Sequence, residues 1–250
     1  MDIWKYFAIG HADHVFCNPM NEAKFDEIVG LLRLAPGDRI LDVACGKAEF
    51  LVRVVEKWGC SGVGVDLSPP FVADARANAA SRGVAPLLEF IELEGSKYDA
   101  PPGSFRAAVC LGASWIWSGY AGMLDAMSRF ASPGGFVLLG EPFWRRPPSA
   151  AYLKAAGLQA DSFDTHAGNL RAGEKVGLAP LHSIVSNEDD WDHYEGRQWY
   201  ATERYAADNP EDPDVPELLA TMRRNRDQYL SGGRDELGWA IYLFGKPRSS

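Results

Sequence analysis

A regular alternation of short apolar runs with helical patterns, beginning at residue 39, restricts the fold of this 250-residue sequence more than any other feature. Residues 51–58 repeat apolar side chains at helical spacing, and Gly59 is predicted to end that helix. Ser68-Pro69 predicts the start of the next helix, as N-cap and first helical position. Extended runs are predicted at 39–44, 61–66, 87–93, 107–112 and 136–140. Alternation on this short pitch predicts a doubly wound α/β fold, a mostly parallel sheet with helices on both faces.

The pattern becomes looser after Glu141. We expect helices at 147–156, 190–207 and 216–230, strands at 181–186 and 237–244, and a solvated acidic loop at 208–214. A long helical excursion before a terminal strand predicts a lid. No linker divides the chain, so we expect one domain over 1–250. Its parts are an N-terminal cap (1–30), a binding core (31–145), substrate-side helices with the lid (146–236) and the terminal strand (237–250).

The charge balance restricts the partners. The net charge of −9 argues against a nucleic-acid or anionic membrane surface, each of which favours a basic face. No apolar run is long enough to span a bilayer and the first residues lack a signal-peptide pattern, so we expect a cytoplasmic protein. The four cysteines form no Cys-x-x-Cys pair and are expected to be reduced thiols. A neutral or cationic small molecule fits this composition best.

Polar and small residues follow each predicted strand of the core. They are the turn 44–48, Asp66, Glu94, the segment 112–115 and Glu141. Ligands of such sheets bind beyond the carboxyl ends of the strands. A small-residue turn entering a helix lets a ligand approach backbone N–H groups, and an acid 20 residues beyond Gly46 is suitably spaced for ribose hydroxyls. Glu94 is expected to accept the amine of an adenine.

Two nucleoside cofactors fit a ribose-binding acid, NAD and S-adenosylmethionine. The dinucleotide fingerprint requires G-x-G-x-x-G after the first strand, whereas this turn reads Ala-Cys-Gly-Lys-Ala at 44–48. Asp42 would repel a pyrophosphate but suits an amino-acid ammonium, which favours S-adenosylmethionine. The glycines at 59–64 lead into the second strand, where we expect them to permit close packing.

Residues 41–48 resemble the first motif of class I S-adenosylmethionine-dependent methyltransferases, and residues 62–68 resemble their second motif. Further segments resemble a group of bacterial proteins of this superfamily: His14 with Asn18-Pro19, 112–116, 140–145 and 191–195. The resemblance implies a seven-stranded Rossmann-like sheet with a last antiparallel strand. It also implies S-adenosylmethionine as cofactor and methyl transfer to a small-molecule acceptor.

When the roles of the family's motif residues are transferred position by position, the resemblance implies that Asp42 orients the methionine ammonium and that Asp66 binds the ribose. Ala44 and Ala48 replace glycines of the first motif, so only Gly46 is expected to need an unusual backbone conformation. The complete set of implied cofactor-binding residues is Asp42, Ala44, Cys45, Gly46, Asp66, Leu67, Glu94, Gly95, Ser96, Leu111, Gly112 and Trp115.

Two residues are candidate bases for an acceptor that must lose a proton. Glu141 follows the fifth predicted strand directly, and His14 lies in the segment expected to fold over the cofactor. Alternatively, Glu141 is a solvated or helix-capping carboxylate, and His14 is a structural histidine. A thiol or amine acceptor needs no base.

Several aromatic residues are candidates for contacts to the cofactor or the substrate. Trp115 and Trp117 are placed to contact a sulfonium through their ring faces, or else to cover the core. Trp191 and Tyr194, spaced as neighbours on one helix, are candidate substrate contacts, with Trp144 on the opposite wall. The alternative is that these rings only pack against one another.

The sequence alone leaves other functions open. His11, His14 and Cys17 recur every third residue, but three mixed ligands do not complete a tetrahedral site, and no metal is expected. A protein that binds S-adenosylmethionine or S-adenosylhomocysteine without transferring methyl is the principal alternative. An NAD-dependent oxidoreductase is another. The sequence does not indicate the oligomeric state or the atom that is methylated.

Overall fold

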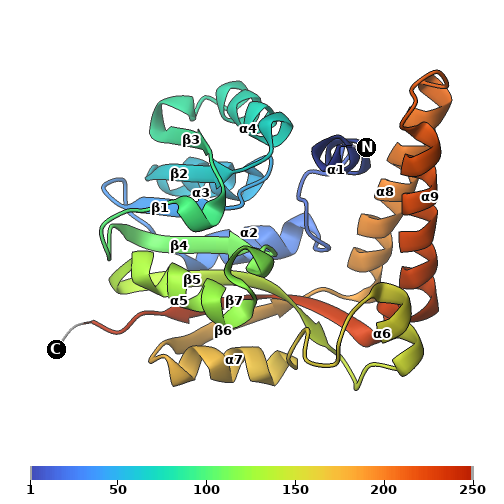
Figure 1. Ribbon diagram of the computed structural model, residues 1–250. Helices are drawn as coiled ribbons and strands as arrows, with labels where there is room; N and C mark the ends of the chain where they lie inside the picture. The colour runs from blue at the N-terminus through green and yellow to red at the C-terminus, as the bar shows by residue number, and fades with distance from the viewer. Residues whose placement is uncertain (1, 249–250) are drawn as a thin grey trace.

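A seven-stranded sheet with helices on both faces forms the body of the computed structural model, which describes residues 2–248 (Figure 1). The strand order is β3-β2-β1-β4-β5-β7-β6. Strand β7 is antiparallel to both of its neighbours, and the remaining pairs are parallel. The predicted fold class is therefore confirmed. The strands are β1 (Arg39–Val43), β2 (Ser61–Asp66), β3 (Leu88–Glu92), β4 (Phe105–Leu111), β5 (Ala131–Trp144), β6 (Ala179–Val185) and β7 (Leu237–Gly245).

The helices divide between the two faces of the sheet and its carboxyl edge. Helices α2, α3 and α4 pack on one face, and α5 and α7 on the other. Helices α1, α6, α8 and α9 stand beyond the carboxyl ends of the parallel strands (Figure 1). Their bounds are α1 (Ile3–Gly10), α2 (Glu22–Leu31), α3 (Glu49–Trp58), α4 (Pro69–Ser81), α5 (Tyr120–Phe130), α6 (Ala150–Ala156), α7 (His166–Lys175), α8 (Glu188–Asp208), α9 (Val215–Gln228) and α10 (Arg234–Glu236).

Local signals in the core segment explain its helix ends and close packing. The Ser68 hydroxyl caps α4 ahead of Pro69, and Gly59 ends α3 with φ +64°, both as predicted. A Cβ on Gly62 would come within 2.8 Å of Leu51, and one on Gly64 within 2.9 Å of Cys45. These glycines therefore permit close packing, as expected.

Three features differ from the sequence-based expectation. Strand β5 begins at Ala131, because residues around Gly134 pair with the chain end at Lys246 instead of forming a separate turn. The predicted helix 147–156 begins only at Ala150, where Ser149 supplies the cap. Helix α7 was not predicted, because it has no apolar stripe: its buried residues are Asn169 and Gly173.

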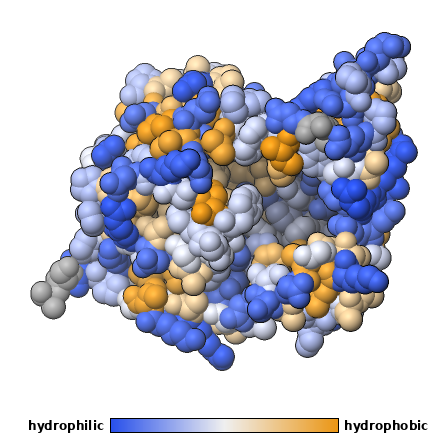
Figure 2. Space-filling view, in the orientation of Figure 1, coloured by the Kyte–Doolittle hydropathy of each residue, from blue (hydrophilic) through white to orange (hydrophobic). Residues whose placement is uncertain are grey.

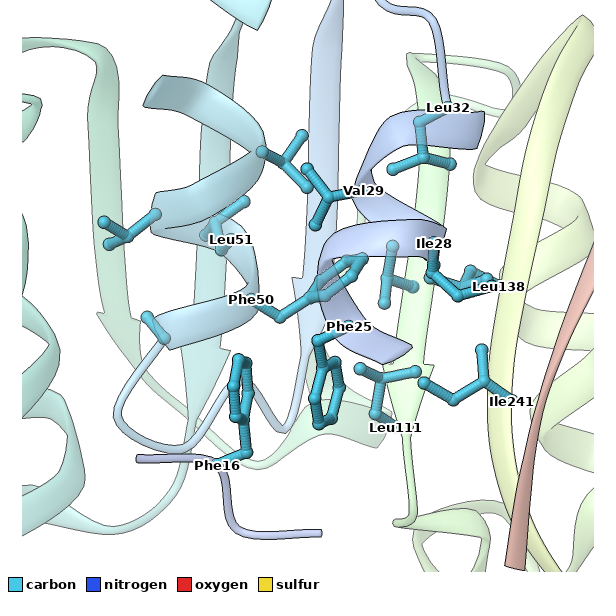
Figure 3. Close-up of a cluster of buried hydrophobic side chains, with 14 of the residues drawn as sticks. Phe16, Phe25, Ile28, Val29, Leu32, Phe50, Leu51, Leu111, Leu138 and Ile241 are labelled. Carbon is cyan, nitrogen blue, oxygen red and sulfur yellow. The ribbon is translucent and has the colours of Figure 1, made fainter. Parts of the chain in front are cut away.

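The N-terminal segment is anchored by aromatic packing. Phe16 stacks on Phe25 with ring centroids 3.7 Å apart, and Phe50 lies 6.1 Å from Phe25 (Figure 3). Phe25 belongs to α2 and Phe50 to α3, so this cluster joins both helices to the chain that precedes them. Asn18 adds a hydrogen bond of 3.0 Å to the Leu111 carbonyl at the end of β4. Residues 11–20 are thereby held at the carboxyl edge of the sheet.

Helices α8 and α9 form the predicted helical excursion before the terminal strand. The acidic connection between them is not simply a solvated loop, because the Lys5 ammonium bridges Asp212 and Asp214 at 2.7 Å each. This contact ties the hairpin to α1. Across residues 2–248, none of the helices combines the length and apolar character needed to traverse a bilayer.

Candidate active site

The carboxyl ends of five neighbouring strands open into one cavity of about 430 Å³. Figure 2 shows this face of the molecule hollowed between the sheet and the α8–α9 pair. Fourteen sequence-predicted site residues line the cavity: Asp42, Ala44, Cys45, Gly46, Asp66, Leu67, Glu94, Gly95, Leu111, Gly112, Trp115, Glu141, Trp191 and Tyr194. Three others, His14, Ser96 and Trp144, are not among its lining residues.

The turn after β1 has an unusual backbone. Ala44, Gly46 and Ala48 all adopt left-handed conformations, with φ of +59°, +55° and +58°. The expectation that only Gly46 needs such a conformation is therefore wrong. The turn keeps its shape with alanine at the other two positions, although each alanine costs roughly 1–2 kcal/mol in this region.

Asp66 joins this turn to the end of β2. Its Oδ2 accepts a hydrogen bond of 2.8 Å from the Gly46 N–H, and its Oδ1 accepts one of 2.8 Å from the Ser68 N–H. An ionised carboxylate offers about four acceptor positions, so about two remain for a ligand. Both partners come from the backbone, and Asp66 is thus fixed in orientation before a ligand binds.

Two buried acids carry no cationic partner. Burial, followed by the nearby charge of Asp66, raises the pKa of Asp42 well above its usual range, and burial also raises the pKa of Asp66. Within residues 2–248, neither forms a salt bridge. A cationic group of a ligand would stabilise the Asp42 carboxylate, so this residue fits the ammonium of S-adenosylmethionine.

Glu94 lies at the exposed rim of the cavity. Its carboxylate accepts hydrogen bonds from the Ser96 hydroxyl at 2.8 Å and forms an ion pair with the Lys97 ammonium at 2.6 Å. Ser96 itself is directed to this carboxylate and lies off the cavity. Glu94 and Gly95 are the members of this segment that reach the cavity.

Glu141 lies inside β5, which continues to Trp144, so the prediction that Glu141 directly follows this strand is wrong. Its Oε1 accepts a hydrogen bond of 2.9 Å from the Ser114 hydroxyl, and its Oε2 is buried with no hydrogen-bond partner. Burial raises the pKa of Glu141 to about 7. A carboxylate of this kind accepts a proton near neutral pH more readily than an exposed one. Ser114 belongs to the segment 112–115 that was predicted at a strand end, but its hydrogen bond to Glu141 was not predicted.

His14 does not share the cavity with Glu141. Its Nε2 donates a hydrogen bond of 2.9 Å to the Tyr194 carbonyl, and its Nδ1 is buried without a partner. Burial lowers the pKa of His14 to about 4. His14 thus lies outside the cavity that Glu141 lines, and its hydrogen bond joins the N-terminal segment to α8.

The aromatic wall consists of residues from several elements. Trp191 lies between the cavity and Tyr229, with ring centroids 6.1 Å apart. Trp144 is placed behind the wall, because its indole N–H donates to the Ala160 carbonyl at 2.9 Å and its ring packs on Phe163. Trp144 thus packs against a residue that lines the cavity and does not itself line it.

Several lining residues were not predicted as site residues, including Phe163 and Trp239. Trp239 reaches the cavity because β7 pairs with β5 in a register that places it opposite Pro142. No local sequence pattern specifies that register. Within residues 2–248, no three His, Cys, Asp or Glu side chains are grouped to hold a metal ion.

The strand order, the turn after β1 and the acids that line the cavity define a Rossmann-like protein with a ligand cavity at the carboxyl edge of its sheet. Residues 40–135 match the family described as a methyltransferase domain. Over 244 residues the chain is 32% identical to the uncharacterised protein YjhP of Escherichia coli (strain K12), covering 97% of this chain and 98% of YjhP.

Two solved structures agree with this match. The S-adenosylmethionine-dependent methyltransferase of Geobacter sulfurreducens, in complex with S-adenosylhomocysteine, superimposes with a TM-score of 0.91 at 31% identity over 99% of each chain. The corresponding enzyme of Thiobacillus denitrificans, with the same ligand, gives 0.89 at 32% identity over 98% of this chain and 99% of that one. The chain belongs to the S-adenosylmethionine-dependent methyltransferases. This membership confirms the predicted class and sets the NAD-dependent alternative aside.

Proposed function

We propose that this methyltransferase modifies a small molecule with a largely apolar or aromatic body and a proton-bearing nucleophile, and that Glu141 is the catalytic base. The observation that carries the proposal is the buried Oε2 of Glu141, which lies in a cavity-lining residue and has no partner. Ser114 fixes the other oxygen, so the free oxygen is the one that receives the proton.

The lining of the cavity favours such an acceptor. Aromatic side chains are numerous in the lining, and in this proposal six of them form the acceptor side: Trp4, Phe7, Phe163, Trp191, Tyr194 and Trp239. Among the lining residues within 2–248 there is no arginine, and the single lysine, Lys47, donates its ammonium to backbone carbonyls. A carboxylate or phosphate on the acceptor would find no free cation here. This supports a neutral or cationic acceptor.

Support for a small acceptor comes from two further observations. The chain carries a net charge of −9, which is unfavourable for nucleic acid. A ubiquinone biosynthesis O-methyltransferase of Pseudomonas aeruginosa, 30% identical over 49% of this chain and 50% of that one, is named for a small-molecule pathway.

The cofactor is held, in this proposal, by the residues at the ends of β1 and β2. Asp42 faces the methionine ammonium, the turn 44–46 lies along the methionine, and Asp66 accepts the ribose hydroxyls. When bound, S-adenosylmethionine supplies an electrophilic methyl group on a cationic sulfur. Alignment of the two reactants and exclusion of water are the main contributions expected of the cavity, and effective molarity can contribute roughly 7–11 kcal/mol.

The test uses methyl-labelled S-adenosylmethionine and fractions of a bacterial metabolite extract. We expect wild-type protein to label a small product. Glu141→Gln keeps the size of the side chain and the contact to Ser114 but cannot accept the proton, so turnover should fall by roughly 10²–10⁴-fold. Affinity for S-adenosylhomocysteine, measured by calorimetry, should be unchanged.

The matched control is Glu236→Gln. Glu236 is also buried, but it accepts a hydrogen bond from the Ser149 N–H and does not line the cavity. This control should retain turnover. Full turnover in Glu141→Gln would contradict its role as base, and the absence of any labelled product would contradict the proposed function.

A further inference from the structure

Tyr194 and His11 form a hydrogen-bonded pair in the wall of the cavity. Tyr194 lies on α8 and His11 directly follows α1, and both line the cavity. The Tyr194 hydroxyl is 2.9 Å from His11 Nε2, and His11 Nδ1 is 3.0 Å from the Phe7 carbonyl oxygen.

The direction of these bonds follows from the partners. A carbonyl oxygen only accepts, so Nδ1 carries the ring proton and donates to Phe7. Burial lowers the pKa of His11 to about 4, and the ring holds one proton at neutral pH. Nε2 is therefore an acceptor, and Tyr194 donates its hydroxyl proton to it. The phenol oxygen is left with lone pairs and no proton to donate elsewhere.

The pair is held in place from both sides. His14 donates to the backbone carbonyl of Tyr194 at 2.9 Å. Lys47, in the turn after β1, donates to the carbonyls of His11, Ala12 and His14 at 2.7, 3.2 and 3.3 Å. The phenol oxygen thus has a fixed position relative to the turn that lies along the cofactor in the proposed function.

We propose that Tyr194 is a positioning residue whose phenol oxygen accepts a hydrogen bond from a positively charged group at the methyl-transfer position, while His11 holds the phenol proton away from it. The inference rests on the proposed function and deepens it. The site selects a cationic donor at that position, such as a methyl group on a sulfonium, over the uncharged thioether that remains after transfer. Tyr194 would thereby favour binding of substrate cofactor over product.

Sinefungin and S-adenosylhomocysteine test this without knowledge of the acceptor. Sinefungin carries an ammonium-bearing carbon where the cofactor carries its methyl sulfonium, whereas S-adenosylhomocysteine has an uncharged sulfur. We expect wild-type protein to bind sinefungin more tightly, as measured by calorimetry. Tyr194→Phe, which removes one oxygen, should reduce this preference roughly tenfold and leave S-adenosylhomocysteine affinity unchanged.

Two further variants complete the experiment. Tyr205→Phe is the matched control, because its hydroxyl binds Asp212 and does not line the cavity; it should keep the wild-type preference. His11→Leu removes the group that holds the phenol proton and should also lower the preference. A separate measurement is the long-range ¹H–¹⁵N spectrum of His11, which should show the Nδ1-protonated tautomer in wild-type protein.

The outcomes distinguish failure of this inference from failure of the proposed function. An unchanged preference in Tyr194→Phe, an equal loss of affinity for both ligands, or an Nε2-protonated His11 would overturn the inference. Failure of wild-type protein to bind either ligand would instead contradict the proposed function on which it rests.

Discussion

The backbone N–H of Gly46 donates a hydrogen bond of 2.8 Å to Oδ2 of Asp66, which joins the turn after β1 to the end of β2. One carboxylate therefore fixes the turn and faces the cavity. Substituting Asp66 should affect both the fold and the ligand, and the two effects can be measured separately.

Asp66→Asn should weaken binding of S-adenosylhomocysteine by roughly 1–3 kcal/mol, because the ribose hydroxyls lose a charged acceptor. Protein stability should also fall, since an amide cannot accept from both backbone N–H groups. Calorimetry and urea unfolding report the two effects. Asp74→Asn, at an exposed position on α4, is the control and should change neither. Unchanged ligand affinity in Asp66→Asn would remove this residue from the site.

Ala44→Gly and Ala48→Gly should each stabilise the protein by roughly 0.5–1 kcal/mol. Glycine adopts the left-handed region without the penalty of a Cβ, and part of that gain is offset by the greater freedom of glycine in the unfolded chain. Urea unfolding measures the change. Ala73→Gly, an exposed position within α4, should have the opposite sign, because it lies in a right-handed helix. Destabilisation by both turn variants would show that the turn does not hold strained alanines.

Glu141→Gln should stabilise the protein at pH 8 and much less at pH 5. Burial raises the pKa of Glu141 to about 7 from an ordinary value of 4.5. The unfolded chain loses its proton near pH 4.5 and the folded chain retains it, so the stability from this group is lost as pH rises from 4.5 through 7. The full effect is roughly 3 kcal/mol.

The measurement is the free energy of unfolding of wild type and variant at both pH values. Glu89→Gln, at an exposed position, is the control. An advantage of Glu141→Gln that does not grow with pH would contradict an uncompensated carboxylate at this position.

Lys47→Met should loosen residues 3–14. The ammonium of Lys47 donates to three backbone carbonyls of this segment, and methionine offers no donor. Hydrogen exchange of the α1 amides should increase severalfold, while exchange in β4 stays slow. Lys175→Met, an exposed substitution on α7, should leave α1 unchanged. Equal protection of α1 in Lys47→Met and wild type would show that the Lys47 hydrogen bonds are not needed to hold the segment.

Much of the proposed cofactor-binding part of the cavity could be predicted, because the sequence patterns that indicate it are local. The acids at 42, 66 and 94 follow buried strands, and parallel strands bring their carboxyl ends to one edge. The structure places all three in one cavity. Strand β2 begins and ends where the apolar run predicts, because the turn after Gly59 and the cap at Ser68 bound it.

The acceptor side could not be predicted in the same way, because its contacts join distant segments. His11 meets Tyr194 across 183 positions, and Trp239 enters through the register of an antiparallel pair. Aromatic residues at helical spacing do not distinguish a cavity wall from a core, so Trp144 and Trp191 have similar sequence signals but different positions. The left-handed alanines were missed since residue type alone argues against them.

The most direct test of the account is a crystal structure of the protein with S-adenosylhomocysteine bound. We expect the ligand in the cavity, with its ribose hydroxyls within 3.2 Å of the Asp66 carboxylate, its ammonium near Asp42, and Glu141 beside the space next to its sulfur. A ligand bound elsewhere, or one whose sulfur is separated from Glu141 by protein, would contradict the account.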